Sequence, residues 1–207
     1  MLLVVGLGNP GVDYTKNRHN IGFLALEKIH HAYDFSPFRS KFKGDTAVAI
    51  IDSKKVMLLK PNTYMNLSGH AVKAAKTFYK IPSKNVLVFH DELDLEFNKV
   101  RVKRGGGHAG HNGLKSIHNY IGANYGRVRL GIGHPGDKTR VTSYVLQNFK
   151  KDEMISVVKL LDAIAKEFPR LVRGDDGGFM SKVANTMSLN TPQPELKPKS
   201  PHTIKES

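Results

Sequence analysis

A polar loop near the N-terminus contains the residues best suited to chemistry. The run from Gly6 to Asn20 has the sequence GLGNPGVDYTKNRHN and follows the apolar residues 2–5, which are typical of a strand. The next amphipathic segment begins only at about Ile21. Loops that follow a rigid strand often carry catalytic groups, and a histidine can exchange a proton near neutral pH. His19 is therefore a candidate general base.

The same loop contains the glycine pattern of dinucleotide-binding proteins, Gly6-x-Gly8-x-x-Gly11. In that fold the third glycine opens a helix, and an acidic residue about 20 positions later binds the ribose. Here a polar loop follows Gly11, and Glu27 falls inside the helix predicted over residues 21–33. The sequence therefore argues against a nicotinamide-dependent oxidoreductase, which stays a weak alternative.

The composition is that of a basic protein without cysteine. The chain has 207 residues, 40% of them hydrophobic, and a formal net charge of +14, which suits one well-packed domain. From Asn190 onward three lysines and two glutamates leave a net charge of +1, so +13 belongs to the preceding residues. This excess indicates an anionic partner such as nucleic acid. The lack of cysteine excludes disulfides, thiolate chemistry and cysteine-bound zinc.

The sequence predicts neither a membrane span nor a cleaved secretory signal. Its longest apolar runs have about five residues, whereas a membrane-spanning helix needs about 20. No basic region precedes the first apolar residues, as it would in a secretory signal. We therefore expect a cytoplasmic protein.

Hydrophobic periodicity predicts an α/β fold, with a single domain at residues 1–189 and a disordered tail at 190–207. The expected architecture is a mixed, twisted β-sheet flanked by helices on both faces. Residues 175–178 are expected to form a flexible joint. Strands are predicted at residues 2–5, 46–51, 55–59, 85–89, 100–103, 127–132 and, at the sheet edge, 141–146; helices are predicted at 21–33, 68–79, 112–121, 152–168 and 179–189.

An acidic cluster follows one buried strand. His90-Asp91-Glu92-Leu93-Asp94 comes at the end of the strand predicted over residues 85–89. The carboxyl ends of strands in open α/β sheets are where ligand and catalytic groups gather. Ordinary turn chemistry is one alternative. Metal binding is another, but no further carboxylate pattern completes such a site.

Two other polar segments precede helices. Asn66 and Ser68 lie where the helix predicted over residues 68–79 begins, so capping of that helix is expected of Ser68 and is one of two roles open to Asn66. His108 and His111 lie in a glycine-rich loop before residues 112–121. They could pair on a metal ion, but no third ligand has a suitable spacing, so loop and capping roles are favoured.

Basic residues alternate with apolar ones on two predicted strands. This spacing places each basic set on one face of its strand. Around a glycine-rich loop, two such faces are typical of a phosphate clamp. The alternating residues are Lys99, Arg101 and Lys103 on one strand and Arg127 and Arg129 on the other.

Together these segments resemble the bacterial-type peptidyl-tRNA hydrolase family over the chain up to about Leu189. The resemblance implies a monomeric enzyme that hydrolyses the ester joining a peptide to the terminal ribose of tRNA, so that the tRNA is recycled. It implies neither a metal nor an organic cofactor. The matching segments, in family order, are Gly6–Gly22, Lys60–Gly69, Val88–Leu95, Lys103–Ile117 and Arg127–Gly136.

The resemblance also implies roles for single residues. His19 would activate the hydrolytic water, Asp91 would orient its imidazole, and Asn9 would help to distinguish N-acylated substrates. Asn9, Asn66 and Asn112 would contact the peptide backbone and the ester. Tyr14 and Tyr64 would line the site near the tRNA end. Lys103 and Arg129 would bind tRNA phosphates.

Departures from the family pattern are small and touch no proposed catalytic group. Tyr64 replaces a common phenylalanine, Ala109 replaces a glycine, and residues 96–98 replace a turn with proline and glycine. The main rival is an RNA-binding module without catalysis. It accounts for the charge but gives no role to His19 and Asp91.

Overall fold

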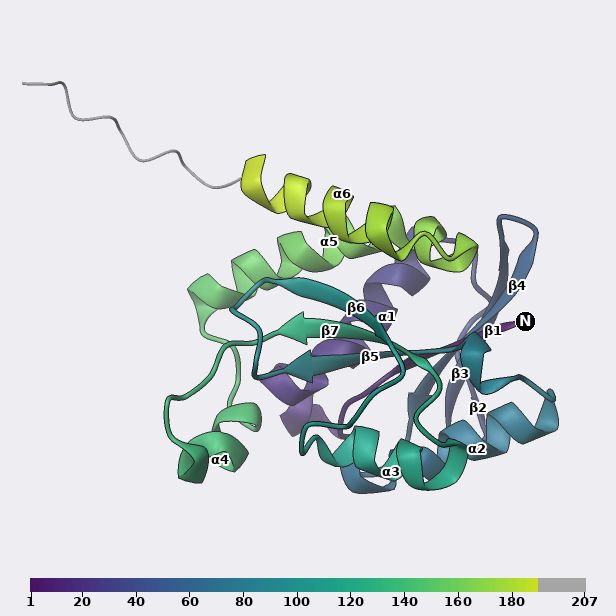
Figure 1. Cartoon of the computed structure of the whole chain (residues 1–207), viewed down its shortest axis with the longest axis horizontal. Coiled ribbons are helices and arrows are strands. Elements are labelled where there is room, and N and C mark those ends of the chain that lie inside the picture. Colours follow the sequence, from purple (N-terminus) through teal and green to yellow (C-terminus); the bar gives the residue numbers. More distant parts are fainter. Residues whose placement is uncertain (190–207) are drawn as a thin grey trace, which may run out of the picture.

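The computed structural model describes residues 1–189, and its seven strands form one mixed sheet (Figure 1). The strand order is β2-β3-β4-β1-β5-β7-β6. The central strand β1 pairs in parallel with β4 and β5, and β5 pairs in parallel with β7. The other pairs are antiparallel. The strands are β1 Leu2–Gly6, β2 Arg39–Lys41, β3 Gly44–Ile51, β4 Lys54–Pro61, β5 Val86–Glu92, β6 Val100–Arg104 and β7 Gly126–Gly131.

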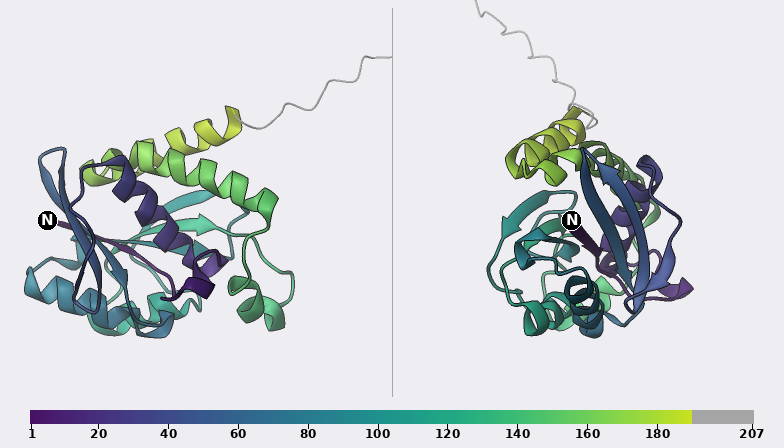
Figure 2. Two further views of the ribbon diagram at one scale, coloured as in Figure 1. Left: turned by 180° about the vertical axis from the view of Figure 1, so that it is seen from behind. Right: turned by 90° about the vertical axis from the view of Figure 1, so that its right-hand side faces the viewer.

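Helices cover both faces of this sheet (Figure 2). One face packs against α1, α5 and α6, and the other packs against α2 and α3. The α/β class and the mixed sheet between two helical layers are therefore confirmed. The helices are α1 Ile21–Ala32, α2 Ser68–Phe78, α3 Asn112–Ile121, α4 Val141–Val145, α5 Lys151–Arg173 and α6 Asp176–Leu189.

Strand β1 is apolar at every position because both of its faces are buried. Val4 packs in the core beneath α1 and α5, whereas Leu3 and Val5 pack in the core beneath α2 and α3. All three side chains are fully buried. A strand covered on both sides has a continuous apolar run, not an alternating one.

The chain approaches itself closely where α1 begins beside β1 and β5. The backbone N–H of Leu7 donates to the carbonyl of Phe89. A Cβ atom at Gly22 would lie 2.4 Å from that same carbonyl oxygen and 2.5 Å from the nitrogen of Leu7, so only glycine fits. This contact fixes the loop before α1 against the carboxyl end of β5.

The segment at residues 141–146, predicted as an edge strand, is helical instead. It forms α4, preceded by a short 3-10 turn at Lys138–Arg140 that Asp137 caps through the N–H of Thr139. The two edge strands of the sheet are β6 and β2, and β2 was not predicted. The strand prediction was wrong because alternation over so few residues does not separate a strand from one helical turn.

Helix α5 is longer than predicted because a tertiary hydrogen bond compensates for a proline. We expected it to end at Phe168, but it continues through Pro169 to Arg173. Proline cannot donate to the carbonyl four residues earlier. The hydroxyl of Tyr33 donates to that carbonyl, at Ala165, over 2.9 Å.

The joint expected at residues 175–178 is also mostly helical. Gly174, with φ 91°, ends α5, and α6 begins at Asp176. The carboxylate of Asp175 accepts the N–H of Gly178, which is the hydrogen bond of a helix cap. The tail predicted at 190–207 lies outside the described residues.

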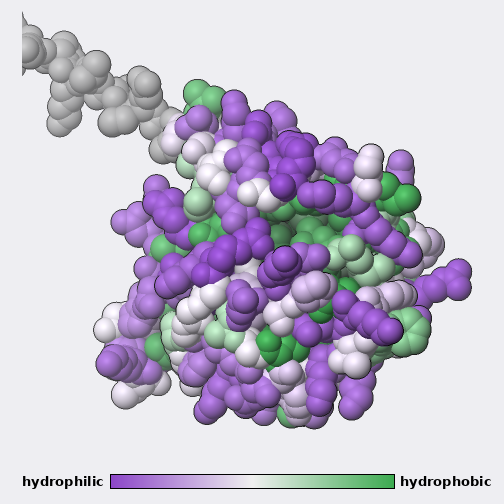
Figure 3. Space-filling model, turned by 45° about the vertical axis from the view of Figure 1, so that its right-hand side comes forward, coloured by the Kyte–Doolittle hydropathy of each residue, from purple (hydrophilic) through white to green (hydrophobic). Residues whose placement is uncertain are grey.

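The face of the molecule drawn in Figure 3 is mainly hydrophilic, with hydrophilic side chains around a hollow in which hydrophobic ones gather. Within residues 1–189, no helix has the length and apolar character needed to cross a bilayer.

Candidate active site

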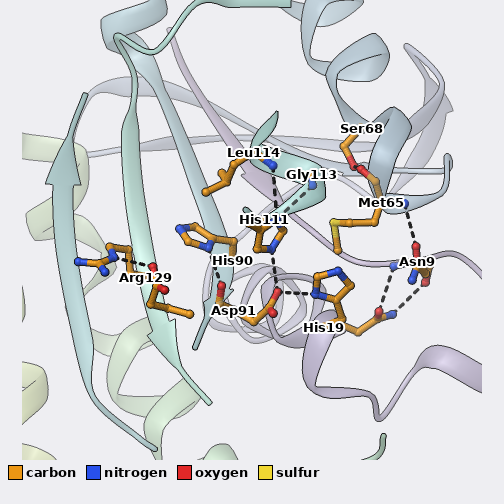
Figure 4. Close-up of polar contacts among 12 residues, drawn as sticks. Asn9, His19, Met65, Ser68, His90, Asp91, His111, Gly113, Leu114 and Arg129 are labelled. Atoms are coloured by element: carbon orange, nitrogen blue, oxygen red, sulfur yellow. Dashed lines mark hydrogen bonds and ion pairs between the residues drawn. The ribbon is translucent and has the colours of Figure 1, made fainter. Parts of the chain in front are cut away.

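His19, Asp91 and His111 meet at the carboxyl end of β5 (Figure 4). The Nδ1 atom of His19 lies 2.8 Å from Oδ1 of Asp91. The Nε2 atom of His111 lies 2.9 Å from the same oxygen. His19 comes from the short turn before α1, and His111 from the residue before α3. One carboxylate oxygen thus contacts two imidazole rings that come from separate loops.

The hydrogen bonds determine which nitrogen of each ring carries hydrogen. Nδ1 of His111 accepts the backbone N–H groups of Gly113, at 3.1 Å, and Leu114, at 3.4 Å. Nε2 of His111 therefore carries the hydrogen and donates to Asp91. His19 donates to Asp91 through Nδ1, which leaves the lone pair of its neutral ring on Nε2. That lone pair is the basic one.

The charges of this group favour an ionised Asp91. Burial disfavours its carboxylate, but the nearby His19 and His111 hold the pKa of Asp91 well below its usual value. Burial likewise disfavours a charged His19, yet the charge and hydrogen bond of Asp91 outweigh it and raise the pKa of His19. Asp91 therefore stabilises the imidazolium that proton transfer to His19 would create.

A third histidine lies beneath this group and stays neutral. His90 is 1% exposed, and its Nδ1 atom lies 2.7 Å from the carbonyl oxygen of Asp91. Burial, followed by the effect of His111, lowers the pKa of His90 to about 3. Its ring meets that of His111 edge-on at 5.1 Å between centroids. His90 thus packs under the site without adding charge at neutral pH.

Asn9 is held so that its amide nitrogen remains available. Its Oδ1 atom accepts the backbone N–H of Met65 over 2.8 Å. The side chain of Asn20 forms two further bonds with the backbone of Asn9, from Asn9 N to Oδ1 at 3.0 Å and from Nδ2 to Asn9 O at 2.9 Å. No described residue accepts a hydrogen bond from Nδ2 of Asn9. This nitrogen can therefore donate to a ligand.

Asn9, His19, Asp91 and His111 line a cavity of about 610 Å³. Helix α4 and the residue after it supply an apolar part of the wall through Val141, Val145 and Leu146. A buried imidazole with a free lone pair and an amide donor in one cavity could serve as general base and oxyanion donor in the hydrolysis of a carbonyl compound. The predicted site residues that line it are Asn9, His19, Tyr64, Asn66, Asp91 and Asn112.

Comparison with known proteins agrees with this geometry. A model of the family described as peptidyl-tRNA hydrolase matches residues 3–192. The chain belongs to the peptidyl-tRNA hydrolase family. It is therefore a hydrolase, as the resemblance implied, and the oxidoreductase and the non-catalytic RNA-binding module are set aside.

Relatives in this family are similar over most of their length. The peptidyl-tRNA hydrolase of Rhodospirillum centenum is 54% identical over 184 residues, which are 89% of this chain and 81% of the relative. That of Dinoroseobacter shibae is 54% identical over 205 residues, covering 99% of this chain and 86% of the relative. A crystal structure of the Acinetobacter baumannii peptidyl-tRNA hydrolase has a TM-score of 0.83 and 39% identity, over 88% of this chain and 94% of that one.

Three predicted residues of this peptidyl-tRNA hydrolase family member lie outside the cavity wall. Tyr14 is half-buried in a short turn beside Gly11. Lys103 is exposed on β6. Arg129 on β7 donates from Nε to Glu92 over 2.7 Å and is partly buried.

The alternating basic residues of β6 and β7 share one face of the sheet, but they are not equally exposed. Arg101 faces Arg129, and Lys103 faces Arg127, in the strand register. Arg127 is 4% exposed and donates to the carbonyls of Gly105 and Gly107. It therefore supports the glycine-rich loop from below, and Lys103 presents its charge to solvent beside that loop.

The capping predictions are resolved differently for each segment. His111 caps α3, as expected. Ser68 does not cap α2 but donates its hydroxyl to the carbonyl of Met65, and no side chain caps that helix. Asn66 lies in the turn before α2 and lines the cavity. The capping prediction for Ser68 was wrong because the turn begins the helix without a side-chain cap, and of the two roles left open for Asn66 capping is excluded.

Within residues 1–189, one group has the arrangement that a metal ion would need. The ligand atoms of His19, Asp91 and His111 lie within 4.8 Å of one another. However, the imidazole nitrogens that face Asp91 carry hydrogen and donate to it, so a metal ion would have to displace both bonds. Hydrogen bonding accounts for this arrangement without a metal.

Three features of the site have no clear signal in the sequence. One is the bond from His111 to the oxygen of Asp91 that His19 also contacts, because the sequence favoured only loop and capping roles for His111. Asn20 supports Asn9 from a position next to His19. Arg18, one position earlier, is 3% exposed although it is charged. Residues 17–20 are all polar, a composition typical of exposed loops, so nothing in the sequence indicated that this loop is buried.

Proposed function

We propose that this chain hydrolyses peptidyl-tRNA with His19 as the general base. The observation that carries this role is the buried hydrogen bond of 2.8 Å between His19 and Asp91 at the wall of the cavity. As water adds to the ester carbonyl carbon, its proton passes to Nε2 of His19. Asp91 stabilises the resulting imidazolium, as the carboxylate does in hydrolase triads.

The second half of the reaction returns this proton. The tetrahedral intermediate breaks the bond to the ribose oxygen, which takes the proton from the imidazolium of His19. The products are a tRNA with a free terminal hydroxyl and a peptide carboxylic acid, which loses its proton to solvent and becomes a carboxylate. His19 is then neutral again, so no proton is gained or lost by the enzyme.

Amide side chains support recognition of the acyl group. The free Nδ2 atom of Asn9 can donate to the carbonyl oxygen as negative charge develops on it. Asn66 and Asn112 also line the cavity and suit a peptide backbone, because an amide both donates and accepts without titrating. These three asparagines would favour N-acylated substrates over free aminoacyl-tRNA.

The tRNA binds on the basic face beside the cavity in this proposal. Lys103 and Arg129 contact phosphates, and Tyr14 and Tyr64 lie near the tRNA end. Phosphate contacts dominate the affinity of proteins for RNA, and the charge of +13 before Asn190 supports such a partner. We further propose that the chain acts as a monomer in the cytoplasm, with neither metal nor organic cofactor.

A release assay tests this function. N-acetyl-aminoacyl-tRNA, treated with the purified chain after dialysis against a chelator, should release free tRNA, and free aminoacyl-tRNA should react much more slowly. His19→Ala should lower kcat by about 10²- to 10⁴-fold. Its affinity for deacylated tRNA should remain that of the wild type. A variant with wild-type kcat would remove His19 from this role, and loss of activity on dialysis would show a metal requirement.

A further inference from the structure

Arg18 is a buried charge directly before His19 in the chain. Its side chain is 4% exposed. Its Nη2 atom lies 3.0 and 2.7 Å from the two carboxylate oxygens of Glu153 in α5. Its Nη1 atom donates to the carbonyl of Asn148 over 2.8 Å. Burial of an ion pair carries a desolvation penalty that often exceeds the attraction, so stability alone is a poor explanation for such a residue.

Aromatic rings enclose the same guanidinium. Its Cζ atom lies 4.5 Å from the centroid of the Tyr144 ring in α4 and 5.3 Å from that of Phe149. The hydroxyl of Tyr144 donates to the carbonyl of Ile132, just after β7, over 2.6 Å. Arg18 therefore contacts α4, α5 and the segment between them, and one of its partners is anchored to the sheet.

Backbone bonds join the same two segments beside Arg18. The N–H of Arg18 donates to Gln147 over 3.0 Å, and the N–H of Phe149 donates to Lys16 over 3.0 Å. The side chain of Asn17 donates to that of Asn148 over 2.7 Å. The loop that carries His19 is thus bonded, residue by residue, to the connection between α4 and α5.

This connection continues directly from the apolar wall of the cavity. Val145 and Leu146 line the cavity, and Gln147 and Asn148, which follow them, accept hydrogen bonds from Arg18. A shift of the loop would therefore move the wall, and a shift of the wall would move His19. This set of bonds therefore joins the His19 loop to the α4 wall of the cavity.

We infer that Arg18 is a positioning residue for hydrolysis: through Glu153 and the segment 147–149 it fixes the His19 loop relative to the α4 wall of the cavity. The inference rests on the proposed role of His19. Arg18 does not touch the reacting atoms. Its removal should lower kcat because the base no longer meets a correctly placed ester.

The test compares two arginines, Arg18 and Arg170, whose carboxylate partners lie in α5 or just after its C-terminal end. Arg18→Met removes the side-chain contacts with Glu153 and Asn148 and leaves the backbone bonds between the two segments in place. Arg170→Met is the matched control, since Arg170 contacts Glu167 and Asp175 over 2.9 Å each at the far end of α5, away from the cavity. Arg18→Met should lose kcat roughly 10- to 100-fold, the scale of a misplacement of about 1 Å, with KM little changed. Arg170→Met should keep wild-type kcat even if its Tm is lower than that of the wild type.

A double variant separates positioning from simple stabilisation. Arg18→Met leaves Glu153 without its partner, whereas Arg18→Met/Glu153→Met removes both charges. Replacing a whole buried pair by apolar side chains often restores stability. We expect Tm to recover in the double variant while kcat stays low. Recovery of kcat together with Tm would overturn the inference, and the double variant still tests it if Arg18→Met fails to fold.

His19→Ala, measured in the same series, separates this inference from the proposed function. If His19→Ala is inactive and Arg18→Met has wild-type kcat, only the positioning role fails. If His19→Ala keeps wild-type activity, the assignment of the base itself fails. Arg18→Lys should fall between the wild type and Arg18→Met, because an ammonium keeps the charge but cannot place one nitrogen on Glu153 and a second on the carbonyl of Asn148, as the guanidinium does. Equal loss in Arg18→Lys and Arg18→Met would show that geometry, not charge, positions the loop.

Discussion

Nδ1 of His19 donates to Oδ1 of Asp91 over 2.8 Å, although the two residues are 72 positions apart. Strands β1 and β5 are parallel neighbours, so the loop after β1 and the end of β5 lie at the same edge of the sheet. The close approach of Gly22 to Phe89 then fixes the loop against β5. His19 and Asp91 are therefore placed by the centre of the sheet, its most deeply buried part.

Replacement of Asp91 by asparagine should lower the rate and move its pH dependence. Asp91 raises the pKa of His19, so Asp91→Asn lowers that pKa. The base must be neutral to accept a proton, and the rate falls as the pH drops through the pKa of His19. The acidic limb of the kcat/KM profile should therefore move to lower pH, with a smaller loss of kcat than in His19→Ala. A limb that stays in place would show that another group controls it.

The amide nitrogen of Asn9 can be removed without removing its contact with Met65. Asn9→Asp keeps an oxygen that accepts the N–H of Met65 but replaces the free donor with negative charge. We expect kcat to fall by about 10²- to 10³-fold, as for loss of an oxyanion donor. Asn119→Asp, on the exposed side of α3, is the control for added charge. Wild-type kcat in Asn9→Asp would exclude Asn9 as a donor to the carbonyl oxygen.

Lys103 should contribute one phosphate contact. Its replacement by alanine should weaken tRNA binding and reduce the slope of log K against log salt by about one. Lys166→Ala, an exposed lysine on α5, should leave that slope unchanged. Filter binding over a series of salt concentrations measures both. If the two variants have the same slope as the wild type, the phosphate contact lies elsewhere.

His90 should make the fold sensitive to acid. The pKa of His90 is about 3 in the folded chain, against a usual value of 6.5, so the unfolded chain binds the extra proton first as the pH falls. Stability is therefore lost as the pH falls from 6.5 towards 3, by roughly 1 kcal/mol per pH unit for this one group.

Urea unfolding at about pH 7 and about pH 5 measures this loss. Between about pH 7 and about pH 5, the free energy of unfolding of His90→Leu should fall by less than that of the wild type. His31→Gln, which changes an exposed histidine of α1, should lose as much as the wild type. Equal losses in the wild type and His90→Leu would contradict the lowered pKa of His90.

The sequence predicted the central strands of the sheet and the segments that line the cavity, because both depend on local patterns. Continuous apolar runs indicated the buried strands β1 and β5. Polar residues that interrupt the pattern just after those strands indicated His19 and Asp91. The resemblance added Asn9, Asn66 and Asn112, which now line the same cavity.

Contacts between distant segments decided the rest. Helix α5 passes through Pro169 because Tyr33, far away in the sequence, donates to the carbonyl that the proline leaves without a partner. His111 can reach Asp91 only once α3 is placed against β5. Arg18 is buried because α4 and α5 supply its partners. Local periodicity reports which side of an element is apolar, whereas these interactions depend on which elements meet, and folding alone brings them together.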